Sequence, residues 1–186
     1  MADPVDETSA DLPEPDDAEL EAFWRLARSH ARLNALPGYL GVNPIETLRP
    51  PAWGFGATPE HADELGALVA DGTKTATASA LWDYEATGEP VPEPGEMSIV
   101  LDGSAHPIAL IVTTEVEVAA FDQVSADHAH AEGEGDRTLA HWREVHERFF
   151  TEHKDHDRPF APDMPVVLER FTLLYAAPGA GGDASG

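Results

Sequence analysis

The stretch that decides the fold is Asp71-Gly72-Thr73-Lys74-Thr75-Ala76-Thr77-Ala78-Ser79. Gly72 suits the left-handed position that ends a helix, and an amphipathic helical pattern precedes it. From Thr75 onward, hydroxyl side chains alternate with alanines, which predicts a strand with one polar face and one small apolar face. Lys74 stands at the entrance of this strand, beside a hydroxyl-lined surface that can hydrogen-bond a polar ligand.

The elements around this stretch follow from hydrophobic spacing and from capping residues. A first helix is predicted over 18–34. Thr58-Pro59-Glu60 starts a second helix, because threonine caps a helix and proline suits its first position. The other predicted elements are strands over 75–84, 96–101, 106–118 and 166–175, a short helix over 125–133, and a longer helix over 137–153 capped by Asp136. Such a chain fits an α+β fold, a small mixed β-barrel flanked by helices, and not a parallel doubly wound sheet.

Composition indicates one compact domain with an acidic tail. The chain has 186 residues and is 42% hydrophobic, enough for a core of its own. Residues 1–17 are rich in Asp, Glu and Pro and are predicted to be disordered. The domain is expected over 18–175, and a flexible Gly/Ala-rich tail over 176–186.

The charge of the chain limits its ligands. The formal net charge is −24, of which residues 1–22 carry nine negative charges and no positive one, so the remainder still sums to −15. A broad phosphate-tracking surface needs many Lys and Arg contacts. The charge therefore favours a small substrate, or one extruded nucleotide in a pocket. A local basic patch on the first helix remains open, because Arg25, Arg28 and Arg32 share one side of it.

Several other classes of protein are disfavoured. The chain has no cysteine, which excludes disulfides and cysteine metal sites. Its acidic start has no signal-peptide pattern, and its longest apolar run, 107–112, is too short to span a bilayer, so a cytoplasmic protein without membrane contact is expected. His141 and His146 are five apart and do not share a helix face. With no metal-binding, phosphate-loop or dinucleotide motif either, we expect no metal and no cofactor.

A second stretch adds to the first. It is His128-Ala-His-Ala-Glu-Gly-Glu-Gly-Asp136-Arg-Thr-Leu-Ala-His-Trp142-Arg143. Together the two stretches resemble the ASCH family, whose domain is similar to the RNA-binding PUA domain. The family's marks are a Gly-x-Lys-Thr-x-Thr strand start after a helix and a later Glu-rich turn that leads into a Trp-containing helix. The resemblance covers residues 24–175.

The resemblance implies a chemistry. Some small ASCH proteins are amidohydrolases that remove the acyl group from N4-acylcytidine with a lysine, a threonine three residues on, and a distant glutamate. Lys74 and Thr77 match the first two. Glu134 matches the third with a one-residue difference in spacing, so Glu132 is the alternative. This chain is longer than those enzymes and has Ser79 where they have a basic residue.

Geometry restricts how the catalytic candidates can meet. Residues three apart on a regular strand point to opposite faces, so Lys74 and Thr77 converge only if Lys74 still belongs to the turn or if a bulge intervenes. Gly72 favours the turn. A threonine hydroxyl needs an adjoining base to become a nucleophile, and a lysine whose pKa is lowered by burial could be that base.

Four more residues are candidates for binding substrate. Thr75 and Ser79 offer hydroxyls on the polar face of the strand. Trp53 and Trp82 offer rings that could stack on a base, although an aromatic side chain is more often part of the core.

Three functions stay open on these observations. The first is a hydrolase of acylated cytidine, the second a ribonuclease of single-stranded RNA, which other long ASCH proteins resemble, and the third a non-catalytic RNA-binding module. The partner is accordingly a nucleoside or single-stranded RNA, and no residue pattern points to an oligomeric state. A closed, nucleoside-sized pocket would favour the hydrolase, and an open basic groove the other two.

Overall fold

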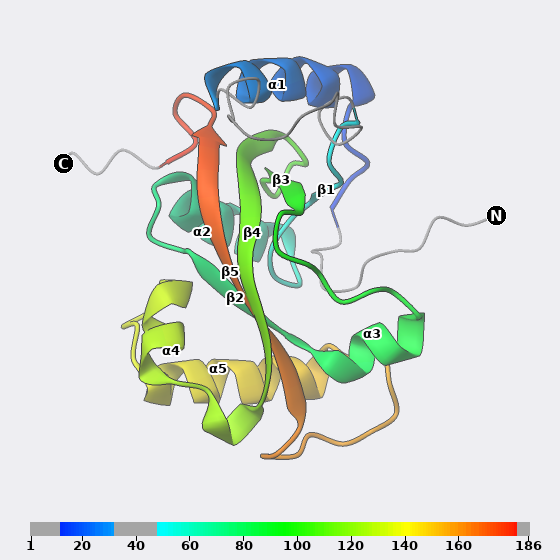
Figure 1. The fold of residues 1–186 in the computed structure, drawn as a ribbon, viewed down its shortest axis with the longest axis vertical. Coiled ribbons are helices and arrows are strands. Elements are labelled where there is room, and N and C mark those ends of the chain that lie inside the picture. Colours follow the sequence, from blue (N-terminus) through cyan, green and yellow to red (C-terminus); the bar gives the residue numbers. More distant parts are fainter. Residues whose placement is uncertain (1–11, 32–47, 182–186) are drawn as a thin grey trace.

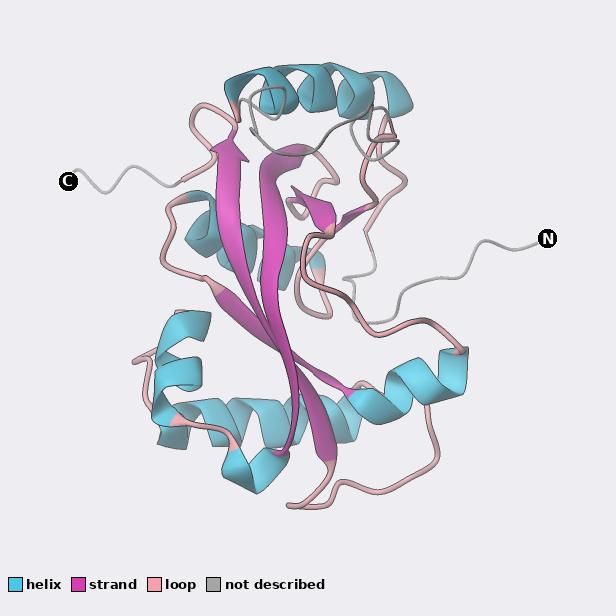
Figure 2. Ribbon diagram, viewed as in Figure 1, coloured by secondary structure: helices cyan, strands magenta, loops and turns pink. Residues whose placement is uncertain are grey.

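A five-stranded mixed sheet forms the centre of the molecule (Figures 1 and 2). The structure is a computed structural model, and it describes residues 12–31 and 48–181. The strands are β1 (Ala52–Trp53), β2 (Ala76–Ala80), β3 (Met97–Leu101), β4 (Pro107–Ala120) and β5 (Pro165–Ala176). The helices are α1 (Asp17–His30), α2 (Pro59–Ala70), α3 (Leu81–Thr87), α4 (Ala126–Glu132) and α5 (Leu139–Glu152), with a short 3₁₀ turn, η3 (Phe121–Gln123).

The strand order is β1-β3-β4-β5-β2. The β1–β3 pair is parallel, and the other three pairs are antiparallel. The predicted α+β class with a mixed sheet is therefore confirmed. Closure into a barrel is not part of the described pairing, because β1 and β2 lie at opposite ends of the strand order.

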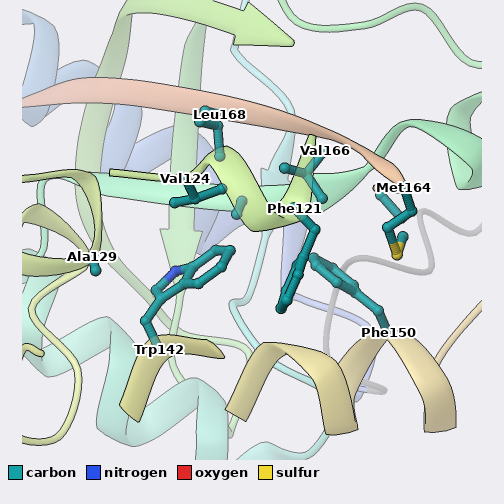
Figure 3. Close-up of a cluster of buried hydrophobic side chains, with 10 residues drawn as sticks. Phe121, Val124, Ala129, Trp142, Phe150, Met164, Val166 and Leu168 are labelled. Atoms are coloured by element: carbon teal, nitrogen blue, oxygen red, sulfur yellow. The ribbon is translucent and has the colours of Figure 1, made fainter. Parts of the chain in front are cut away.

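Helices cover both ends of the long β4–β5 pair (Figure 1). At one end, α1 packs its apolar face, which includes Phe23 and Trp24, against β3 and β4. At the other end, α5 contributes Trp142 and Phe150 to a cluster with Phe121 and residues of β5, as Figure 3 shows. Residues from both of these ends line the cavity described below.

Two predicted elements were wrong in their details. The strand predicted over 75–84 ends at Ala80, and Trp82 belongs to α3, which ends at the left-handed Gly88 (φ 77°). Tertiary contacts stabilise this helix, because the Trp82 ring packs on His156 and Arg158 lies over it. The cap of α5 is Thr138, two residues after Asp136.

The reason for the shifted cap is the backbone at Arg137. Its φ of 62° is left-handed, so a helix cannot run through this residue. Asp136 instead accepts hydrogen bonds from the backbone and hydroxyl of Thr138, which fixes the residue that does cap the helix.

Both ends of the predicted domain extend further than expected. The helix α1 begins at Asp17, capped by Asp16, and Leu12 packs against its cluster. The strand β5 continues to Ala176, and Ala177 donates a backbone hydrogen bond to Ile108. The other parts of the two predicted tails, residues 1–11 and 182–186, lie outside the described residues. Within the described ranges, no helix is long and apolar enough to cross a membrane.

Candidate functional site

Lys74 belongs to the turn before β2 and not to the strand. Gly72 has a left-handed φ of 83°, as its place after α2 requires, and the Lys74 amide donates to the Leu68 carbonyl at 2.9 Å. The strand β2 begins two residues later, at Ala76. The turn, which is one of the two routes to convergence, thus frees Lys74 from the alternation of the strand, so that it and Thr77 line the same cavity.

The end of α4 brings the two candidate carboxylates to Lys74. The amide and hydroxyl of Thr75 both donate to the Ala131 carbonyl, at 2.8 and 3.2 Å. Gly133 ends α4 with φ 75°, and a Cβ at this position would lie 2.8 Å from the Thr73 carbonyl oxygen. This close approach brings Glu132 and Glu134 within hydrogen-bond distance of the lysine ammonium.

The Lys74 ammonium is buried and surrounded by acceptors. Only 2% of Lys74 is exposed. Its Nζ donates to Glu134 Oε1 at 2.7 Å, to Glu132 Oε2 at 3.3 Å and to the Glu132 carbonyl at 3.5 Å. It also lies 5.3 Å from the centre of the Phe55 ring, within the range of a cation–π contact.

These contacts decide the charge of Lys74. Burial acts to lower the pKa of the lysine, but the negative charges and hydrogen bonds of Glu134 and Glu132 outweigh it, and the pKa is raised above its ordinary value. Lys74 is therefore an ammonium group at neutral pH. This differs from the neutral lysine that a base would require.

Glu132 is the centre of a buried polar network. It is 1% exposed. Its Oε1 accepts from Trp142 Nε1 at 2.7 Å and from His128 Nε2 at 3.0 Å, while its Oε2 accepts from Lys74 and lies 3.4 Å from His146 Nε2. With four donors on its two oxygens, this carboxylate has no lone pair left for a ligand.

His146 completes the network as a second buried cation. Its Nδ1 lies 2.9 Å from the Trp142 carbonyl and its Nε2 faces the Glu132 carboxylate, so both ring nitrogens face acceptors, which favours the doubly protonated ring. Burial opposes this charge, but the carboxylate of Glu132 raises the pKa of His146. Burial likewise opposes the charge of Glu132, but His146 and Lys74 hold its pKa well below the usual range.

The network should give the protein a characteristic pH dependence of stability. The contribution of Glu132 is complete above its ordinary pKa of 4.5 and is lost as the pH falls through its lowered folded value. The contribution of His146 is complete below its ordinary pKa of 6.5 and is lost as the pH rises through its raised folded value. We therefore expect the free energy of unfolding, measured with urea, to decrease as the pH rises above the ordinary histidine pKa of 6.5.

The matched controls for this pH dependence are two histidine variants. His146→Phe should remove most of the alkaline decrease. His106→Gln should keep most of it, because His106 is an exposed side chain whose pairing with Glu19 lies at the surface. An unchanged alkaline slope in His146→Phe would contradict the cationic histidine.

One large cavity contains the candidate residues. Its volume is about 1700 Å³, and Lys74, Thr77 and Glu134 all line it. The lining includes four Lys or Arg side chains and seven glutamates among the described residues. Glu134, whose side chain is 21% exposed, is open to the cavity, whereas Glu132 is sealed by its donors. Between the two carboxylates, geometry therefore favours Glu134 as the one that meets a ligand.

The four candidates for substrate binding separate into two pairs. Trp53 and Ser79 line the cavity, and Trp53 packs edge-on against Phe55 at a centroid distance of 4.5 Å. Thr75 and Trp82 are not part of its lining. The Thr75 hydroxyl donates a hydrogen bond to the Ala131 carbonyl, and the Trp82 ring packs against His156.

The site also contains two residues, His128 and His146, to which the motifs assigned no role. Each lies four residues from its partner on the same helix, His128 from Glu132 and His146 from Trp142, so helical spacing alone could have linked each pair. His141 and His146 line the same cavity although they are five residues apart. Within 12–31 and 48–181, no three His, Asp or Glu side chains are grouped so that they could hold a metal ion.

Comparison with known proteins gives one family match and two similar solved structures. A model of the ASCH domain matches residues 51–175. The structure of an ASCH domain from Lactobacillus crispatus JV V101 is 30% identical, with a TM-score of 0.73 over 86% of this chain and 96% of that one. Protein EF3133 from Enterococcus faecalis V583 is 36% identical, with a TM-score of 0.70 over 84% of this chain and 88% of that one. No curated protein matches the sequence.

Proposed function

Because this chain belongs to the ASCH domain family, we propose that it is a hydrolase of a modified nucleoside, cleaving the amide of an N4-acylcytidine. The observation that carries the proposal is the convergence of Lys74, Thr77 and Glu134 on one cavity. These are the three residues that the resemblance to the amidohydrolases assigns to catalysis. Separated polar residues can do joint chemistry only where they converge.

The charges of the site favour particular roles. The hydroxyl of Thr77 is the nucleophile that attacks the acyl carbon. The Lys74 ammonium stabilises the negative charge that develops on the acyl oxygen, because a fixed cation in a site shielded from water is most effective where charge appears. Glu134, 2.7 Å from Lys74, orients the ammonium and is open to a ligand. The raised pKa of Lys74 favours this electrostatic role over that of a base.

The charge of the cavity supports a nucleoside over a polynucleotide. With seven glutamates against four basic residues, its lining repels a chain of phosphates. One of the basic residues, Arg49, is already paired with Asp17 and Glu21. A neutral acylated nucleoside meets no such repulsion.

A ribonuclease is the second candidate, and the size of the cavity is what favours it. Pockets for a single small ligand usually measure about 300–1,000 Å³, so a cavity of about 1700 Å³ has room for more than one nucleotide. Arg28 and Arg148 also line it, and they could contact phosphates.

One experiment distinguishes these activities. Purified protein is incubated with N4-acetylcytidine and, separately, with single-stranded RNA, and the products are separated by chromatography. Release of cytidine and acetate is the expected result. RNA fragments without cytidine would favour the ribonuclease, and neither product together with measurable RNA binding would favour the non-catalytic module. Thr77→Val serves as the control for contaminating activity.

We expect Trp53 to contribute to affinity by stacking on the base. Stacking on an aromatic ring contributes about 1–3 kcal/mol per base, so Trp53→Ala should weaken cytidine binding by that amount in calorimetry. Trp82→Phe is the matched control, because Trp82 is an aromatic side chain outside the cavity lining. Equal affinities in wild type and a folded Trp53→Ala variant would assign Trp53 to the core alone.

A further inference from the structure

Two buried cations share one oxygen of Glu132. The Lys74 ammonium lies 3.3 Å from Glu132 Oε2, and His146 Nε2 lies 3.4 Å from the same atom. Hydrogen bonds between two full charges usually measure about 2.7–2.9 Å, so both contacts are longer than usual. Lys74 makes its short contact with Glu134, at 2.7 Å. Competition for Oε2 therefore favours a position of the ammonium near Glu134, the carboxylate that is open to the cavity.

The neighbours of His146 fix the direction of its ring. The imidazole stacks on the indole of Trp142, with a centroid distance of 4.2 Å and an interplanar angle of 17°, and its Nδ1 lies 2.9 Å from the Trp142 carbonyl. Glu132 is held through its other oxygen, Oε1, by Trp142 and His128. Because the ring and the carboxylate are both held in place, a change of charge on His146 acts on Lys74, which shares Oε2 with it.

We propose that His146 is a positioning residue for the reaction: its imidazolium occupies Glu132 Oε2 and thereby keeps the Lys74 ammonium close to Glu134. The inference rests on the proposed hydrolase function, in which Lys74 stabilises the charge on the acyl oxygen. A neutral His146 that keeps its Nδ1 proton for the Trp142 carbonyl presents a lone pair to Oε2. Oε2 is then fully available to Lys74, and the ammonium moves toward Glu132 and away from Glu134.

The direction of the pH dependence follows from the groups that face His146. They are Glu132 at the end of α4, Glu134 just after it, and Lys74, which shares Oε2. Burial opposes the charge of the ring, but the two carboxylates raise the pKa of His146 above its ordinary value of 6.5. The ring is therefore charged below pH 6.5 and loses its proton as the pH rises through the raised folded value. Activity should decrease over the same rise in pH.

The kinetic test is His146→Gln, because glutamine offers a donor to Glu132 Oε2 but carries no charge. We expect kcat on N4-acetylcytidine at neutral pH to fall by about 10²-fold with KM little changed, since a misplacement of about 1 Å can cost this much. The decrease of kcat that follows the histidine should be absent from this variant. His128→Gln is the matched control and should keep the wild-type pH profile, because His128 contacts the same carboxylate through Oε1, which Lys74 does not share.

A measurement without substrate separates this inference from the proposed function. The chain has two lysines, Lys74 and Lys154, so isotope-labelled lysine gives two sets of side-chain signals in NMR spectra, and the exposed Lys154 serves as the reference. In wild type, the Lys74 ammonium signal should move with the same pH midpoint as the ring signal of His146. His146→Gln should remove this movement, and His128→Gln should keep it.

The two experiments give distinct outcomes. If the Lys74 and His146 signals move together but wild type does not hydrolyse N4-acetylcytidine, the proposed substrate fails and the positioning of Lys74 by His146 stands. If the Lys74 signal of wild type does not follow His146, the role of His146 is overturned, and this titration decides even where His146→Gln does not fold. A folded His146→Gln variant with the kcat and pH profile of an active wild type would overturn it as well.

Discussion

Replacing Glu132 with alanine is expected to lower the free energy of unfolding by about 3–5 kcal/mol, the usual effect of removing one partner from a buried ion pair. The reason is that Lys74 and His146 both direct a buried positive charge at this carboxylate. The indole of Trp142 and the ring of His128 would lose their acceptor as well. Urea unfolding followed by circular dichroism at neutral pH measures the change.

The control for this prediction is Glu134→Ala. Glu134 makes the shorter contact with Lys74, 2.7 Å against 3.3 Å, but its side chain is 21% exposed and water can replace it. We therefore expect Glu134→Ala to destabilise the protein much less than Glu132→Ala. Equal losses would mean that stability depends on the lysine contact and not on the four donors gathered around Glu132.

The second large effect concerns catalysis by Lys74 and Thr77. We expect Lys74→Met to lower kcat by about 10²–10³-fold, the usual loss when one group that stabilises an oxyanion is removed. Thr77→Val should abolish turnover. The double variant should be no slower than Thr77→Val alone, because members of one catalytic unit are not additive. Chromatographic assay of cytidine release measures all three variants.

Lys74→Arg separates the two roles that a lysine could have. Arginine stays charged and cannot serve as a base, but its guanidinium is larger and differently shaped. With Lys74 only 2% exposed, the larger group should displace Glu134, so we expect low activity. Turnover above that of Lys74→Met would support the electrostatic role, and additive losses in the double variant above would contradict a single catalytic unit.

Capping residues made much of the fold predictable from the sequence. Thr58 and Gly72 delimit α2 as expected, and Gly72 places Lys74 in a turn, which is why the lysine and Thr77 line the same cavity. The strand assignment failed for residues 81–84, because the alternation continues past Ala80 while tertiary contacts to His156 and Arg158 favour a helix. The alternation of residues in a short stretch of sequence cannot reveal contacts with residues more than 70 positions away.

The candidate site was predictable in part for a similar reason. Lys74, Thr77 and the two glutamates lie within short motifs, so a resemblance could locate them. Glu169, which also lines the cavity, lies in no motif. Its position opposite Thr77 depends on the register between β2 and β5, which are far apart in the chain. The charge of Lys74 also depends on its distances to Glu132 and Glu134, which no spacing in the sequence specifies. Burial alone would lower the pKa of the lysine, and this is why the sequence pointed to a base.

The close contact between Gly133 and Thr73 has a consequence for how the site comes into being. Lys74 and its carboxylates are 58 and 60 residues apart in the chain, and they meet only when the end of α4 reaches the start of β2. Neither the segment with Lys74 nor the segment with Glu132 and Glu134 contains the whole charge arrangement by itself. The site is thus created by a long-range docking event, and activity should report on the completed tertiary structure more sensitively than helix content does. A bulky residue at Gly133 would act as a loss-of-function change in a protein whose reacting groups are all still present.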